Sequence, residues 1–123
     1  MKIVITAQDK NVDAEFDSRF GRCKYFAICN IDTEDCEFLE NEAVGAMGGA
    51  GVKSAQFLAD KNISTVITGH VGPNASRALR ASGIKVFVMK SGTVRDAIKA
   101  YKEKTLDEVS GPTTDPHRGL NMP

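Results

Sequence analysis

The chain has 123 residues, 41% of them hydrophobic and 26% charged, and its 16 basic and 16 acidic residues give a formal net charge of zero at pH 7. This length is typical of a single domain that buries roughly two thirds of its unfolded surface. The balanced charge argues against a general nucleic-acid binder, and no apolar run approaches the roughly 20 residues of a membrane-spanning helix.

The first half of the chain predicts three strands. Residues 2–6 form a short β-branched run, too short for the apolar region of a signal peptide. Residues 23–32 and 36–43 form two further strand-like runs, and the tight polar turn at 33–35 between them predicts an antiparallel hairpin.

The second half of the chain alternates helices and strands. A glycine-rich loop at residues 45–51 precedes the first helical pattern. The predicted elements are a helix from 52 to about 60–62, a strand at 63–68, a helix from Pro73 to Gly83, a strand at 84–89 and a helix from Val94 capped by Thr93 or Ser91. The order β-β-β-α-β-α-β-α predicts an α/β fold around a five-stranded mixed sheet, with helices on both faces and the second strand antiparallel to its neighbours.

The end of the chain differs from the rest in composition. Residues 1–109 are predicted to form the domain, whereas residues 110–123 lack apolar periodicity and predict a flexible tail that is dispensable for folding.

This topology places the candidate functional residues at one edge of the sheet. Right-handed crossovers deliver the parallel strands in one direction, so four connections converge beyond their carboxyl ends. These connections are residues 7–22, 45–51, 69–73 and 90–93. Open α/β sheets bind ligands at such an edge, which predicts a binding site there.

Three residues at this edge are candidate metal ligands, and each also has a structural interpretation. Cys23 and His70 carry a thiol and an imidazole, and either could instead serve the packing of the loops. Met47 lies at the tip of the glycine loop, where a hydrophobic lid or loop anchor is slightly favoured over a thioether ligand.

The other two cysteines, Cys29 and Cys36, are predicted to lie away from this edge and to be buried as small apolar residues. An odd number of cysteines without a C-x-x-C pair is not typical of a disulfide framework, which favours a reducing cytoplasm.

The remaining polar residues at the edge suggest anion binding rather than catalysis. Arg19 and Arg22 could hold an anion or simply be solvated, and the glycine loop matches neither a dinucleotide nor a P-loop fingerprint. No acidic Mg²⁺ cluster and no nucleophile–base pair can be assembled, so the sequence does not call for an enzyme.

Three segments together resemble the dinitrogenase iron–molybdenum cofactor biosynthesis family, which includes the NifX-type carriers and the C-terminal domain of NifB-type proteins. They are residues 18–26, the glycine loop at 45–51 and residues 68–75, and the resemblance covers roughly residues 1–105. It implies a three-layer, ribonuclease-H-like fold without nuclease activity. It also implies a cytoplasmic carrier or scaffold that binds an anionic iron–sulfur or molybdenum-containing cluster and works with cluster-assembly proteins.

The resemblance points to residues 18–23, the glycine loop and residues 69–74, which are the segments that the topology places at this edge. Within them, Cys23 and His70 are the predicted metal ligands, and the predicted cofactor-binding residues are Arg19, Arg22, Met47, Gly48, Gly49, Gly51, Gly72 and Asn74. Many relatives carry histidines in the glycine loop where this chain has Met47, which leaves a cradle of backbone and arginine groups as an alternative to direct ligation. The competing hypothesis is a regulatory or protein-interaction domain that binds a partner or a small anion without metal.

Overall fold

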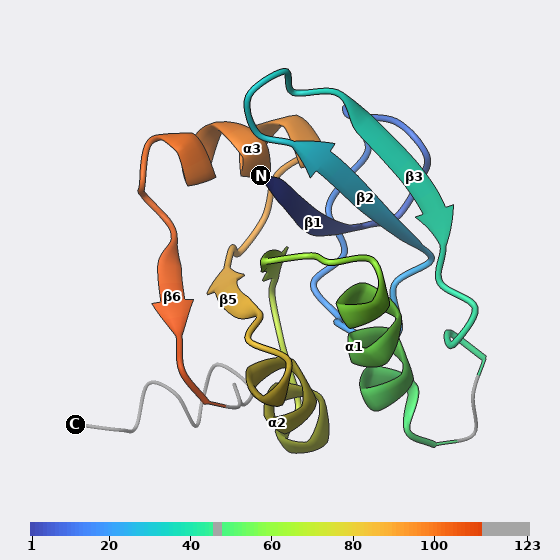
Figure 1. Cartoon of the computed structure of the whole chain (residues 1–123). Coiled ribbons are helices and arrows are strands. Elements are labelled where there is room, and N and C mark those ends of the chain that lie inside the picture. The colour runs from blue at the N-terminus through green and yellow to red at the C-terminus, as the bar shows by residue number, and fades with distance from the viewer. Residues whose placement is uncertain (46–47, 112–123) are drawn as a thin grey trace.

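Six strands form one mixed sheet in the residues that the structure describes, 1–45 and 48–111, and three helices pack on it (Figure 1). The structure is a computed structural model. The elements are β1 (Lys2–Ala7), β2 (Tyr25–Asn30), β3 (Cys36–Glu40), α1 (Ala50–Asp60), β4 (Thr65–Thr68), α2 (Pro73–Ala81), β5 (Lys85–Val88), α3 (Val94–Lys102) and β6 (Asp107–Val109). The strand order is β3-β2-β1-β4-β5-β6.

The predicted element order is confirmed up to α3, but the prediction of five strands is wrong. β2 runs antiparallel to β1 and β3, while β1, β4 and β5 are parallel. A sixth strand, β6, pairs antiparallel with β5, with Val109 opposite Val86 and Asp107 opposite Val88. Two of its three residues are exposed and acidic, so no apolar alternation marks it in the sequence. The ribonuclease-H-like assignment stays a prediction.

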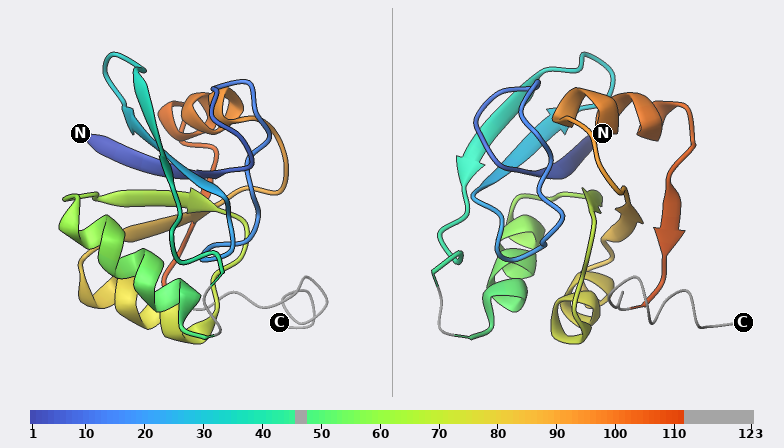
Figure 2. Two further views of the ribbon diagram at one scale, coloured as in Figure 1. Left: turned by 90° about the vertical axis from the view of Figure 1, so that its right-hand side faces the viewer. Right: turned by 180° about the vertical axis from the view of Figure 1, so that it is seen from behind.

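The helices cover both faces of the sheet, as predicted, with α1 and α2 on one face and α3 on the other (Figure 2). Leu58 of α1 and Leu79 of α2 pack into one apolar cluster with Val4 and Val66, whereas Ile98 of α3 belongs to the second cluster. No helix within the described ranges is long and apolar enough to cross a membrane.

A buried pair of threonines marks the carboxyl ends of β1 and β4. Thr6 Oγ1 lies 2.9 Å from Thr68 Oγ1 and donates a hydrogen bond to the carbonyl of Asp17, while the Asp17 N–H donates to the Thr6 carbonyl at 2.7 Å. The two hydrogen bonds between Thr6 and Asp17 are shielded from water, and they hold the loop after β1 across the end of the sheet.

The predicted convergence of loops at this edge is confirmed by hydrogen bonds between them. Arg19 forms an isolated parallel bridge with His70, and the Phe20 N–H donates to the His70 carbonyl at 3.1 Å. The Phe16 N–H donates to the Gly92 carbonyl at 3.0 Å. The connections after β1, β4 and β5 therefore lie side by side.

Cys29 is buried as predicted, but Cys36 is only partly buried, and the structure joins the two in a disulfide that the sequence did not predict. They are register partners across the β2–β3 hairpin, and their Cα atoms are 4.0 Å apart. A tight turn between antiparallel strands places the two side chains directly opposite each other, which a count of cysteines does not reveal. Cys23 is the free cysteine of the described residues. The argument from cysteine usage for a reducing compartment therefore loses its basis.

Candidate functional site

A cleft of about 290 Å³ opens at the predicted edge, between residues 20–22 and the starts of α1 and α2. Its lining consists of Phe20, Arg22, Gly49, Ala50, Gly51, Val52, His70, Gly72, Pro73, Asn74 and Ala75. Six predicted site residues thus come together here: Arg22, Gly49, Gly51, His70, Gly72 and Asn74. Met47 lies outside the described residues, and the exposed Gly48 does not line this cleft.

Glycines allow the backbones around the cleft to approach closely. Gly21 has φ +93°, and a Cβ there would lie 2.8 Å from the Gly51 Cα. A Cβ on Gly51 would in turn lie 2.7 Å from the Ala75 Cβ. Because real Cβ atoms do not tolerate such distances, these two glycines let α1 begin against both the 20–22 loop and α2.

The helices that meet at the cleft begin without side-chain caps. Their N-cap residues, Gly49 for α1 and Gly72 for α2, make no side-chain cap hydrogen bond, and neither first turn contains an acidic residue. In contrast, α3 begins with a capping box between Thr93 and Asp96. A helix start that lacks a cap or a carboxylate offers its N–H groups and its positive dipole end to an external anion.

Three side chains add polar chemistry to this lining. Arg22, His70 and Asn74 are exposed and belong to three different segments. The Arg22 Nη1 donates to the Val44 carbonyl at 2.9 Å, which ties the 20–22 loop to residues 41–45. Guanidinium, amide and imidazole N–H groups all suit an anionic ligand, and the imidazole can also bind a metal.

Arg19 faces a different partner from the one predicted. Its guanidinium donates through Nε and Nη2 to the buried Asp17 carboxylate, both at 3.2 Å, and its backbone N–H donates to the same carboxylate at 2.9 Å. This hydrogen bonding raises the pKa of Arg19. Arg19 does not line the cleft, and its charge instead offsets that of Asp17.

Cys23 is fully buried beneath the loop and does not line the cleft. Burial raises the pKa of its thiol to about 12, and the Asp17 carboxylate adds to the rise. At neutral pH the side chain is therefore a protonated thiol packed in the core with Phe20 and Phe26. Metal ligation by Cys23 stays a prediction, and it would require the loop to open.

Asn41 is a buried residue that the sequence analysis missed. Its Nδ2 donates to the carbonyls of Gly21 at 3.0 Å and Cys23 at 2.9 Å, and its Oδ1 accepts from the Ser54 hydroxyl at 3.2 Å and the Ala43 N–H at 3.1 Å. Asn41 lies between two exposed glutamates, so its neighbours in sequence give no sign of burial. The strand predicted at residues 36–43 includes Asn41, whereas β3 ends at Glu40, so no signal in the sequence marked Asn41 as a residue of this edge.

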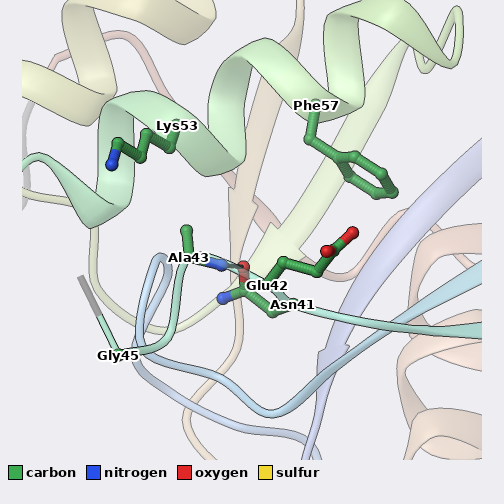
Figure 3. Close-up of a pocket in the computed structure, with 6 residues that line it drawn as sticks. All are labelled: Asn41, Glu42, Ala43, Gly45, Lys53 and Phe57. Atoms are coloured by element: carbon green, nitrogen blue, oxygen red, sulfur yellow. Dashed lines mark hydrogen bonds between the residues drawn. The ribbon is translucent and has the colours of Figure 1, made fainter.

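A larger cleft of about 660 Å³ borders α1 and the 41–45 segment. Figure 3 shows Lys53 and Phe57 on α1, which forms one wall of this cleft. Asn41, Glu42 and Ala43 form the other wall. Its lining carries one lysine and one glutamate, so it has no preference for one sign of charge.

Within the described ranges, no group of three His, Cys, Asp or Glu residues could hold a metal ion. The fold is a small three-layer α/β domain, and the cleft of about 290 Å³ lies at the carboxyl edge of its sheet. The sequence pattern of the dinitrogenase iron–molybdenum cofactor family matches residues 1–104, and the chain belongs to this family. The resemblance noted from the sequence is thereby confirmed, and it links the chain to cofactor biosynthesis or cluster binding.

Three individual proteins are similar over nearly the whole chain. The apo form of the orange protein from Desulfovibrio gigas is 35% identical with a TM-score of 0.88, covering 92% of this chain and 96% of that one. A Thermotoga protein described as a NifB candidate is 33% identical with a TM-score of 0.81, covering 93% and 97%. An uncharacterized protein of Methanocaldococcus jannaschii is 28% identical, covering 88% and 91%.

Proposed function

We propose that this protein is a small non-enzymatic carrier that holds an anionic iron–sulfur or molybdenum-containing cluster in the cleft during cofactor assembly. One observation carries the proposal: two helices start without caps or acidic residues at one cleft that also contains Arg22 and His70. The family assignment supports it, and the structure of the orange protein is described as an apo form, which implies that this relative also has a loaded form.

The cleft suits a small and negatively charged cargo. Its volume of about 290 Å³ is at the lower end of the roughly 300–1,000 Å³ typical of ligand pockets. Backbone N–H groups at the helix starts and the Arg22 guanidinium would stabilise negative charge on the cargo. His70 would provide either a nitrogen ligand to iron or another borderline metal, or an N–H donor to a sulfide.

The proposal is tested by anaerobic titration with two probes, tetrathiomolybdate in one series and ferrous iron with sulfide in the other. Visible absorption and metal and sulfide analysis measure the uptake. We expect the wild type to bind, and Arg22→Ala and His70→Ala each to weaken binding by about tenfold, the loss of one charged or ligand contact. Arg95→Ala serves as the matched control, because Arg95 is an exposed arginine on α3, on the opposite face of the sheet.

A further substitution, at Asn74, should change the affinity for cargo and the stability of the fold in opposite directions. Asn74 lies in the first turn of α2, and Asn74→Asp places a carboxylate there. The helix dipole should make this change stabilising by about 0.3–1 kcal/mol, whereas the same charge should repel an anionic cargo. If neither probe binds to the wild type, the carrier proposal is wrong, and binding of a partner or a small anion without metal becomes the leading hypothesis. Equal binding by the wild type and all cleft variants would show that the cargo lies elsewhere.

A further inference from the structure

The side chain of Asn41 connects three segments around the cleft. Asn41 follows β3 directly and is 4% exposed. It contacts the 21–23 segment through its amide nitrogen, and α1 and the 41–45 segment through its amide oxygen.

The hydrogen-bonding capacity of this amide is fully used. A carboxamide has two N–H donors and one oxygen with two lone pairs. Both donors reach main-chain carbonyls, of Gly21 and Cys23, and both lone pairs accept, from Ser54 and Ala43. Aspartate could keep the two accepted bonds but neither of the donated ones, and alanine would leave all four partners without their bond.

The position of Gly21 gives this arrangement a consequence for the cleft. The carbonyl of Gly21 accepts a hydrogen bond from the Asn41 side chain, while the Cα of Gly21 lies against Gly51 at the start of α1. The neighbouring residues on either side, Phe20 and Arg22, line the cleft, and Cys23 is buried beneath the same segment. The amide therefore sets where one wall of the cleft stands relative to α1.

We infer that Asn41 is a positioning residue: its side-chain amide holds the 21–23 segment against α1, which shapes the cleft for cargo and closes the loop over Cys23. The part that concerns cargo rests on the proposed function. The closure over Cys23 rests on the hydrogen bonds and the burial alone, so the two parts can be tested separately.

The first test measures alkylation of Cys23 by iodoacetamide in the folded protein, with the modified residue located by mass spectrometry. Asn41→Ala should raise the rate of Cys23 alkylation by at least tenfold. Thr93→Ala removes the cap of α3, on the other face of the sheet, and thus controls for a general loss of stability. Ser54→Ala removes only one of the four bonds and should raise the rate by less than threefold.

The alkylation rates of Asn41→Ala and Thr93→Ala are compared at matched free energy of unfolding. If the rate for Asn41→Ala rises no more than the rate for Thr93→Ala, Asn41 does not hold the loop closed over Cys23. If Asn41→Ala does not fold, Asn41→Asp takes its place under the same criterion, because it keeps the two accepted bonds.

The second test measures binding of tetrathiomolybdate under anaerobic conditions. Asn41→Ala should bind about tenfold more weakly than the wild type, while Thr93→Ala should bind equally well. Unchanged affinity combined with fast alkylation would overturn the role of Asn41 toward cargo. If the wild type takes up no tetrathiomolybdate and no iron–sulfide, the proposed function fails, and the alkylation result still decides whether Asn41 positions the loop.

Discussion

Replacing Gly21 by alanine should disrupt the contact between the 20–22 loop and α1. The substitution introduces two costs, because Gly21 has φ +93° and its missing Cβ would lie 2.8 Å from the Gly51 Cα and 2.9 Å from the Gly51 nitrogen. The obstructing atoms belong to backbone, which cannot rotate away as a flexible side chain can. The loop or the start of α1 must therefore move.

The magnitude follows from adding the two costs. A non-glycine residue in the left-handed region costs about 1–2 kcal/mol, and overpacking of a well-packed site costs about 1–3 kcal/mol. Gly21→Ala should thus lower the free energy of unfolding by about 2–5 kcal/mol. Gly83→Ala is the matched control, because Gly83 has φ +75° but no atom within 4 Å of its missing Cβ, so it should show only the first cost.

Urea unfolding followed by far-ultraviolet circular dichroism measures both free energies if each variant unfolds in a single transition. The difference between Gly21→Ala and Gly83→Ala isolates the steric cost at Gly51. Equal losses of stability in the two variants would refute the close approach of the loop and the helix, and with it this account of how the cleft is built.

Three further predictions concern the cysteines and the end of the chain. Folding raises the pKa of the Cys23 thiol from 9.0 to about 12, so the contribution of the protonated thiol to stability is complete below pH 9 and is lost as the pH rises toward 12. The free energy of unfolding should therefore fall by up to about 1.4 kcal/mol per pH unit between pH 9 and 12. Cys23→Ala should remove this dependence on pH. Reduction of the Cys29–Cys36 disulfide, which closes a short loop of sequence separation 7, should lower the free energy of unfolding by about 2–3 kcal/mol. Urea unfolding with and without a phosphine reductant measures this change, and an unchanged free energy would contradict the prediction. Truncation after Val109 should leave the melting temperature nearly unchanged, and a large decrease would show that residues 110–123 contribute to the fold.

The order of the elements was predictable because its signals are local. Pro73 and Gly83 bound α2, and Thr93 caps α3, as their positions in the sequence indicate. The handedness of crossovers then places the connections at one edge, so the meeting of Arg22, His70 and the glycine loop could be expected without coordinates.

The features that the sequence did not predict depend on contacts between distant residues. β6 is recognised only by its pairing with β5, and the disulfide only by the register that puts Cys29 opposite Cys36. Cys23 was correctly placed near the edge, yet its depth depends on the loop that covers it. Asn41 is polar in a polar stretch, and its importance comes from partners about 20 residues before it and 13 residues after it.

Gly72 shows how the sequence of this cleft departs from what stability alone would favour. Its backbone, at φ −74° and ψ 173°, is an ordinary extended N-cap conformation, and its missing Cβ would meet no atom within 4 Å. The fold therefore does not require glycine here, and serine, a better cap, should stabilise α2 by a few tenths of a kcal/mol. A serine side chain would, however, bond the first-turn N–H groups that the proposed function assigns to cargo. Gly72→Ser should raise the free energy of unfolding slightly, measured by urea unfolding, and weaken tetrathiomolybdate binding, measured by anaerobic titration of the same preparation. An increase in both stability and affinity would mean that these N–H groups do not bind the cargo.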